Sequence, residues 1–484
     1  MRSILVFVFV SVCFFGAQAQ TYPGFKHDNR SGAYGTLYQP ASLVHSPYRY
    51  DIGFLSVSAE GTNNIYGINR KTAFLNFNFN NLDAERVKAD GPLRAFVSSE
   101  VNALAIMYKL NPRLAFSIMP RVRMATSLTG LDPKFFEYAE EGFELTEESN
   151  VSMQDRANLA SAVWKEFAIT FSYLLKNDRY NRVSVGAGLK VLSSVGGAYA
   201  QLNEAEFGLD AANREFVGDF SGRYGVSKNL EDLDNLDEAF KQSGQLSLGL
   251  DLGIRLEKPL KVNSCIPYQK LQKRMFRPRI APYRLRLDVS LLDFGRLAFD
   301  GSDGNGELNG LLIPDGNPVY ISLDDKLKGV DNIPELSDSL ATVFNVAKRG
   351  GRFTMSLPTT FNIGADWNLM SGFYAHLGLT LDASALTLAD FRIKTPMRLT
   401  VSPRWESSLF SVYLPATIDQ YSDVTMGLGC RFGPVFFGVN DILPVLAKNE
   451  VRSEGFYFGL KTFFMPKKDK DPSVIECPGG RLKK

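Results

Sequence analysis

The feature that most constrains the fold is a strict alternation of apolar and polar side chains over long segments. Residues 353–369 place an apolar or threonine side chain at every odd position, whereas the even positions read Thr, Ser, Pro, Thr, Asn, Gly, Asp and Asn. Residues 246–256 and 373–383 repeat the alternation. Successive side chains of a strand point to opposite faces of its sheet. The sequence therefore predicts long strands with one apolar and one polar face.

The charges of these segments indicate what the apolar face contacts. Those on the polar parity include Asp251, Arg255, Arg284, Arg286, Asp288, Asp366 and Asp382. A basic side chain that faces lipid at mid-membrane costs about 2–4 kcal/mol, so this segregation suits a membrane barrel. The segments also reach the ~9–11 residues that a tilted crossing needs, whereas strands of soluble sandwiches usually have about 5–6. We therefore expect an all-β, transmembrane antiparallel barrel.

Connection lengths alternate along the chain. Short turns near 111–113, 177–181, 371–372 and 433–434 interleave with long polar stretches at 62–97, 128–158, 200–242 and 299–351. In outer-membrane barrels the short turns face the periplasm and the long loops face outside. This rule predicts an up-and-down barrel of about fourteen strands within residues 48–465, one of them formed by 353–369. Residues 74–79 are a further strand or part of the first loop.

The two ends of the chain have different compositions from the barrel. Residues 1–19 have a charge at Arg2, an apolar run and an Ala-Gln-Ala motif, which predict a signal peptide. Residues 20–47 are polar and contain Gly and Pro, so we expect a lumen plug or, alternatively, a disordered periplasmic leader. Residues 466–484 are expected to form a periplasmic tail. With a formal net charge of +2, nothing indicates nucleic-acid binding.

The sequence contains no pattern typical of an enzyme or a metal site. P-loop, Gly-x-Ser-x-Gly and His-Glu-x-x-His motifs are absent, and His27, His45 and His376 are scattered. We therefore predict no catalytic residues, no metal and no cofactor. Cys265 and Cys477 both fall in predicted periplasmic segments, and we hypothesise that they form a disulfide.

Several stretches resemble a known family. They include Gln39-Pro40-Ala41 before the first strand, "PRVRMATSLTGLDP", "SPRWE" and "GPVFFGVNDIL". Together they are similar to an uncharacterised family of Gram-negative outer-membrane β-barrels, which carries a domain-of-unknown-function label and is distantly similar to fatty-acid-transporter-type barrels. Some of its members add a peptidoglycan-binding domain similar to outer-membrane protein A, which is not expected here. The resemblance implies the architecture and an outer-membrane location, but no activity.

The candidate functional residues are polar side chains predicted to face the lumen. They are Arg121, Arg123, Lys190, Asp251, Arg255, Arg284, Arg286, Asp288, Asp366, His376 and Asp382. Rings of charge can select a solute, but the favoured alternative is that these charges pair across neighbouring strands and fill a closed lumen. Two functions stay open. One is a channel or transporter for a small hydrophobic or amphipathic solute, and the other is a barrel that anchors or joins a cell-surface assembly or secretion complex with envelope protein partners. Outer-membrane lipid is the expected surroundings of either.

Overall fold

The computed structural model describes most of the chain between residues 22 and 462. The described ranges are 22–69, 84–87, 91–140, 150–153, 156–178, 180–210, 215–230, 244–259, 283–311, 333–341, 344–370, 372–422, 424–443 and 450–462. The predicted signal peptide, the segment 74–79, the C-terminal tail and the proposed Cys265–Cys477 disulfide lie outside these ranges.

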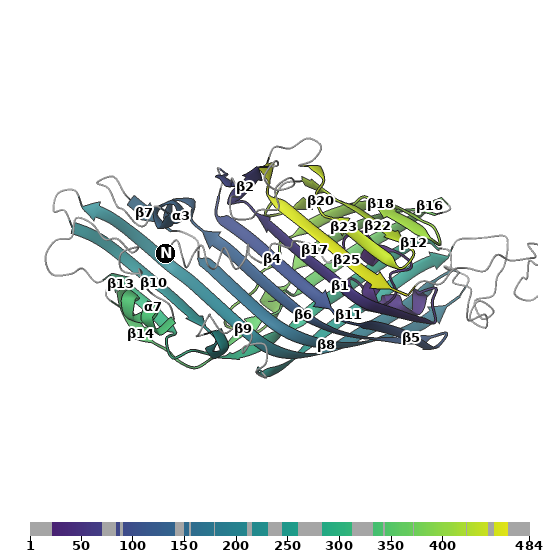
Figure 1. Cartoon of the computed structure of the whole chain (residues 1–484), viewed down its shortest axis with the longest axis horizontal. Coiled ribbons are helices and arrows are strands. Elements are labelled where there is room, and N and C mark those ends of the chain that lie inside the picture. Colours follow the sequence, from purple (N-terminus) through teal and green to yellow (C-terminus); the bar gives the residue numbers. More distant parts are fainter. Residues whose placement is uncertain are drawn as a thin grey trace, which may run out of the picture.

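One antiparallel sheet closes into a ring of about 14 strands (Figure 1). Its strand segments are β1 (Tyr50–Asn63), β4 (Leu93–Asn102), β5 (Ala105–Asn111), β6 (Leu114–Leu131), β8 (Ala157–Asn177), β9 (Arg182–Asp210), β11 (Leu246–Pro259), β12 (Tyr283–Asp300), β15 (Arg352–Ser356), β16 (Thr360–Met370), β17 (Phe373–Asp382), β18 (Arg398–Glu406), β19 (Phe410–Tyr413), β20 (Ala416–Asp419), β21 (Val424–Met426), β22 (Leu428–Phe432), β23 (Val435–Val439) and β25 (Ser453–Lys461). The pairs β4 and β5, β15 and β16, β19 and β20, and β21 and β22 each form one interrupted strand of the ring, because the two segments lie along the same neighbour. The first and last strands pair from Gly53 opposite Lys461 to Thr62 opposite Ser453. The predicted barrel is therefore confirmed.

The outer face of this ring is apolar, as the alternation predicts. Phe171 on β8, Leu189 on β9, Ile254 on β11, Val289 on β12 and Ile363 on β16 are each at least two-fifths exposed. A barrel can keep such side chains exposed when lipid rather than water surrounds it. Among the described residues, no helix combines the length and the apolar character needed to span a membrane.

The long polar stretches contain more regular structure than the sequence predicts. They hold β2 (Tyr66–Asn69), β3 (Ala84–Arg86), α3 (Pro133–Glu140), β7 (Asn150–Ser152), β10 (Glu215–Val226), η5 (Lys228–Leu230), β13 (Gly306–Leu311), α7 (Ile333–Leu340) and β14 (Phe344–Lys348). β24 (Glu450–Val451), in the connection between β23 and β25, pairs with β2. Strand β9 continues past the ring to pair with β10, which pairs in turn with β13. These strands extend the barrel wall at its long-loop end, on the left of Figure 1.

The prediction of one unbroken strand over residues 353–369 is wrong. The segment divides into β15 and β16 at residues 357–359, opposite Asp293 of β12, which has a φ of 56°. This irregularity reverses the inward parity: Met355 and Leu357 are fully buried, whereas Ile363 is exposed. β12 holds one more residue than β11 at this point, because their register shifts between Leu250 and Leu252, and such a bulge bends the strand. β15 and β16 follow the bent β12 without a change of register. The apolar side chains at odd positions before the break therefore face the interior instead of lipid.

An N-terminal segment, residues 22–48, runs inside the ring from its short-turn end. It contains three short 3₁₀ helices, η1 (Phe25–His27), η2 (Gly32–Leu37) and η3 (Pro40–His45). Its backbone and side chains occupy places where the barrel wall has glycine: a Cβ on Gly186 would lie 2.2 Å from the carbonyl carbon of Pro40, and one on Gly253 would lie 1.9 Å from Oε1 of Gln39. The fit leaves no room for a side chain at either wall position.

Candidate functional site

Two networks of ion pairs fill the barrel interior. In the first, the carboxylate of Asp293 accepts hydrogen bonds from Arg123 at 2.8 and 3.0 Å and from Lys190 at 2.5 Å. Asp251 accepts from Lys190 at 2.7 Å and from the backbone N–H of Asp293 at 2.7 Å. The irregular backbone at Asp293 thus aims its side chain at two cations of β6 and β9, strands that do not pair with β12. Arg121 extends the network by bridging Glu100 and Glu166.

The second network lies nearer the short turns. Arg404 makes two 2.7 Å hydrogen bonds to Asp366 and another of 2.7 Å to Glu406. Arg286, opposite Asp366 on the adjacent strand, donates to Glu257 at 3.0 Å. Such charge-assisted, paired contacts stabilise groups that would otherwise be costly to bury.

The N-terminal segment joins these networks through polar side chains. Asp28 pairs with Arg431 at 3.2 Å, and Asn29 donates to Glu406 at 3.1 and 3.2 Å. Gln39 donates to the backbone of Ile254 at 2.9 Å. Burial disfavours ionisation of Asp28, but Arg431 and Arg30 outweigh it and lower the pKa of that carboxyl. The segment is therefore held by charge as well as by fit.

His45 contributes a further contact of the N-terminal segment with the wall. Its ring lies 3.1 Å from Glu257 and 2.8 Å from the hydroxyl of Ser184. Burial outweighs the effect of Glu257 and lowers the pKa of His45 to about 4. The imidazole is therefore neutral at neutral pH and acts as a hydrogen-bonding group.

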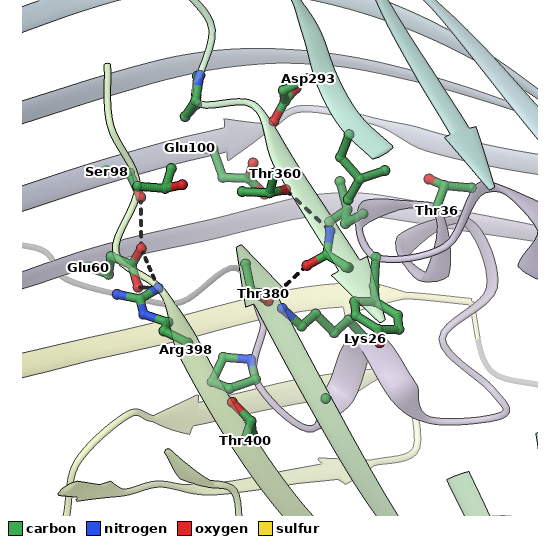
Figure 2. A pocket seen from close by; sticks show the side chains of 18 of the residues that line it. Lys26, Thr36, Glu60, Ser98, Glu100, Asp293, Thr360, Thr380, Arg398 and Thr400 are labelled. Carbon is green, nitrogen blue, oxygen red and sulfur yellow. Dashed lines mark hydrogen bonds and ion pairs between the residues drawn. The ribbon is translucent and has the colours of Figure 1, made fainter. Parts of the chain in front are cut away.

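A polar cavity of about 120 Å³ lies between the N-terminal segment and the outer part of the lumen. One side is formed by Lys26 and His27 of η1 and by Tyr38, which directly follows η2. Another side is formed by Thr395 and Pro396 of the connection between β17 and β18. Wall strands contribute Glu60, Ser98, Thr360, Thr380, Arg398 and Thr400, which surround the cavity in Figure 2. Beyond Phe96 and Pro358 an apolar cluster begins, which includes Trp164, Leu297, Phe299, Phe353, Met355, Leu357, Phe391 and Ile393.

Lys26 extends from η1 into this cavity toward Thr380 (Figure 2). Within the described ranges its ammonium makes no hydrogen bond or ion pair. It lies over the ring of Tyr38, 5.6 Å from the ring centroid. Burial lowers the pKa of Lys26 to about 8, although Glu60 and Glu100 act in the opposite direction. The group therefore stays mostly protonated at neutral pH without a direct counter-charge.

Two histidines meet at the same cavity. The rings of His27 and His376 stack with centroids 3.7 Å apart. The pKa of His27 is lowered, mainly by burial and next by the charge of His376. His376 is 1% exposed, and neither ring nitrogen has a hydrogen-bond partner in the described part of the chain. The facing glycines Gly364 and Gly378 make room for it, since a Cβ on either would lie 2.9 Å from its ring.

The residues that the sequence predicts to face the lumen lie in the two ion-pair networks, in the cavity and near the ends of strands. Those buried in the two networks or beside them are Arg121, Lys190, Asp251, Arg255, Arg286, Asp288 and Asp366. Arg123 is half-buried in the first network, and His376 lines the cavity. Arg255 pairs across strands with Asp288 at 2.7 Å. Asp382 is half-buried and accepts hydrogen bonds from Ser384 and Thr395, so it orders the following turn. Arg284 is exposed at the start of β12, where the register with β11 shifts, so its lumen-facing position stays a prediction.

Sequence reasoning missed several residues of the site. Asp293 carries a charge on the apolar parity of its strand, and this violation was a usable signal for an irregular backbone. Glu60 and Glu100 sit on polar parities and could have been included. Nothing in the local sequence marks Lys26, because its environment is created by strands far along the chain. Among the described residues, no cluster of His, Cys, Asp and Glu has the arrangement of a metal site.

The chain matches a known protein family along most of its length. The model of a family described as "Family of unknown function (DUF5723)" matches residues 40–440. No curated protein matches the chain.

Solved structures with a similar fold include a FadL homologue from Pseudomonas aeruginosa, with 12% identity and a TM-score of 0.42 over 92% of this chain and 95% of that one. Another is the TodX monoaromatic hydrocarbon channel, as a deltaS2 mutant, with 10% identity and a TM-score of 0.43 over 89% and 93% of the two chains. The COG4313 outer membrane channel from Pseudomonas putida F1 has 10% identity and a TM-score of 0.30, covering 86% and 96%. Similarity at this level carries no argument about activity or solute.

Proposed function

The chain belongs to this family of unknown function, and we propose that it is an outer-membrane transporter in which the N-terminal segment is a lumen plug. The observation that carries the proposal is the polar cavity inside the barrel, between the N-terminal segment and the outer lumen. A barrel that served only as an anchor would not need an interior cation and an interior histidine that have no polar partner among the described residues. The apolar outer face supports a location in a lipid bilayer.

The chemistry of the cavity narrows the earlier expectation for the solute. Charged and hydroxyl side chains predominate in its lining, and a purely apolar molecule would leave them without partners. Unmet buried polar groups cost about 1–3 kcal/mol each. We therefore propose a polar or amphipathic solute rather than a hydrocarbon.

Passage through the lumen requires the N-terminal segment to move. The substitution Gly186→Ala would place a Cβ against the backbone of Pro40 and should loosen the segment. Gly188→Ala is the matched control, because its Cβ would meet Thr170 and Asp251 of the wall instead. In proteoliposomes we expect faster uptake of small polar solutes by Gly186→Ala, and by a variant lacking residues 22–47, than by the wild type or Gly188→Ala. Absence of flux in all four proteins would refute transport.

One observation favours the second function, a role in a surface assembly. The sheet formed by β9, β10, β13 and β14 projects past the ring at the long-loop end (Figure 1). Proximity labelling in the native membrane, with a variant lacking residues 203–225, tests this role. If labelling of specific envelope proteins depends on that hairpin while no variant shows flux, the assembly role replaces transport.

A further inference from the structure

We propose that the cavity binds a small hydroxylated monocarboxylate, such as a short sugar acid, with the carboxylate on the ammonium of Lys26. This inference deepens the proposed function by naming the solute class, and it rests on that function only for the direction of movement. Binding itself requires only the site.

The first argument is the state of the charges. Each carboxylate that lines the cavity already has a cation: Glu60 has Arg398 at 2.8 Å, and Glu100 has Arg121 at 3.1 Å. Asp251 and Asp293 share Lys190 at 2.7 and 2.5 Å. Lys26 is therefore the lining cation that, within the described ranges, has no ion pair. A ligand carboxylate would give it the charge-assisted partner that the wall does not supply.

The second argument is the state of the hydroxyl groups. Thr380 donates its proton to Asn362 at 2.8 Å, Thr36 donates to the carbonyl of Ala33 at 2.8 Å, and Ser98 donates to Glu60 at 3.4 Å. The oxygens of these groups still have lone pairs facing the cavity. They can accept hydrogen bonds only from a ligand that carries donors, which favours hydroxyl groups. His376, buried and unpartnered, adds one ring nitrogen that donates and one that accepts.

The third argument is size and charge exclusion. A water needs about 10–15 Å³ of such space, so 120 Å³ fits a ligand with on the order of ten non-hydrogen atoms. The lining has one cation more than it has carboxylates, since Lys26, Arg121, Arg123, Lys190 and Arg398 face Glu60, Glu100, Asp251 and Asp293. One negative charge balances this lining, whereas a dianion such as a phosphate monoester would leave its second charge without a partner. The site therefore suits one carboxylate and several hydroxyls.

Binding of threonate to the purified full-length barrel in detergent, followed by calorimetry, tests the inference. We expect threonate to bind, and threitol, butyrate and glycerol phosphate to bind at least about tenfold more weakly. Lys26→Met should weaken threonate binding about 10- to 100-fold, the range expected for one charged hydrogen bond. Lys26→Arg should retain binding, and Lys176→Met, at an exposed lysine of the short turns, should leave it unchanged.

A pH series separates an ion pair from a loss of fold. Burial lowers the pKa of Lys26 to about 8, so wild-type affinity should fall as pH rises beyond that value. The charged groups that act on it are Glu60, Glu100 and Arg398, and the guanidinium of Lys26→Arg should keep its affinity across the same range. Equal binding by Lys26→Met, tighter binding of the amino acid threonine than of threonate, or no binding by the wild type would each overturn the inference. Binding without flux would overturn transport alone, whereas flux without threonate binding would overturn this inference alone.

Discussion

The two halves of the lumen are closed by different parts of the chain. At the short-turn end, the N-terminal segment is held by buried ion pairs such as Asp28–Arg431, by glycine recesses in the wall and by an aromatic cluster in which Phe25 stacks on Phe436 at 3.9 Å. At the long-loop end, the wall itself supplies an apolar cluster, in which Phe353 stacks on Phe299 at 5.2 Å and Phe391 stacks on Tyr199 at 3.7 Å. The first closure, which contains most of the buried ion pairs with the N-terminal segment, comes from a segment that precedes β1, whereas the second comes from the barrel strands and a connection between them. We therefore expect only the first to be able to leave without unfolding the wall.

The largest effect is expected where the charged half loses one member of a pair. Arg404→Met should lower the free energy of unfolding by about 3–5 kcal/mol, because Asp366 and Glu406 would stay buried without their nearest cation and keep only Arg286 at 3.5 Å and Arg30 at 3.8 Å. Urea titration in micelles measures the change. Arg284→Ala, at an exposed arginine, serves as the control and should change it by less than about 0.5 kcal/mol. Similar values for both would show that the interior charges are solvated.

The apolar half should respond to truncation in a way that depends on parity. Met355→Ala should cost about 2–5 kcal/mol, since Met355 is fully buried in the apolar cluster. Ile363→Ala, an odd position beyond the break, is exposed on the outer face and should cost much less in the same titration. Equal costs would contradict the change of parity at residues 357–359.

The charged half should also be the more sensitive to acid. The pKa of His45 is lowered from 6.5 to about 4 in the folded protein, so only the unfolded chain gains a proton between these values. Stability should therefore fall with pH from about 6.5 to about 4, by up to about 3 kcal/mol, and show no further loss from this group below that range. Comparing pH titrations of the wild type and His45→Gln isolates the contribution. If the free energy of unfolding changed with pH equally in both proteins, His45 would be protonated in the folded state as readily as in the unfolded chain.

The smallest effect concerns the fit of the N-terminal segment. Gly253→Ala would bring a Cβ to 1.9 Å from Gln39 and 2.8 Å from Pro40, and relieving such overpacking costs about 1–3 kcal/mol. Limited proteolysis should cleave residues 22–48 faster in this variant, while the barrel stays intact. Gly188→Ala should keep the wild-type cleavage rate, and faster cleavage there would attribute the effect to the wall.

The sequence by itself determined the barrel, its approximate strand number and its apolar outer face. A period of two is a local property, and lipid selects one parity for apolar side chains over the whole length of a strand. The inward position of Arg121 and of Asp366 follows from the same alternation, as does the lumen-facing polar side of residues 360–369.

Only the tertiary structure decided what the interior contains. The break at residues 357–359 is set by pairing with Asp293, which is distant in sequence, so the alternation of 353–369 continues while its direction reverses. The environment of Lys26 is likewise assembled from β1, β4, β17 and β18. The local pattern determines which face of the sheet a side chain occupies. Partners across the lumen determine whether its charge is paired. Lys26 has no ion pair among the described residues, and we propose that the solute binds there.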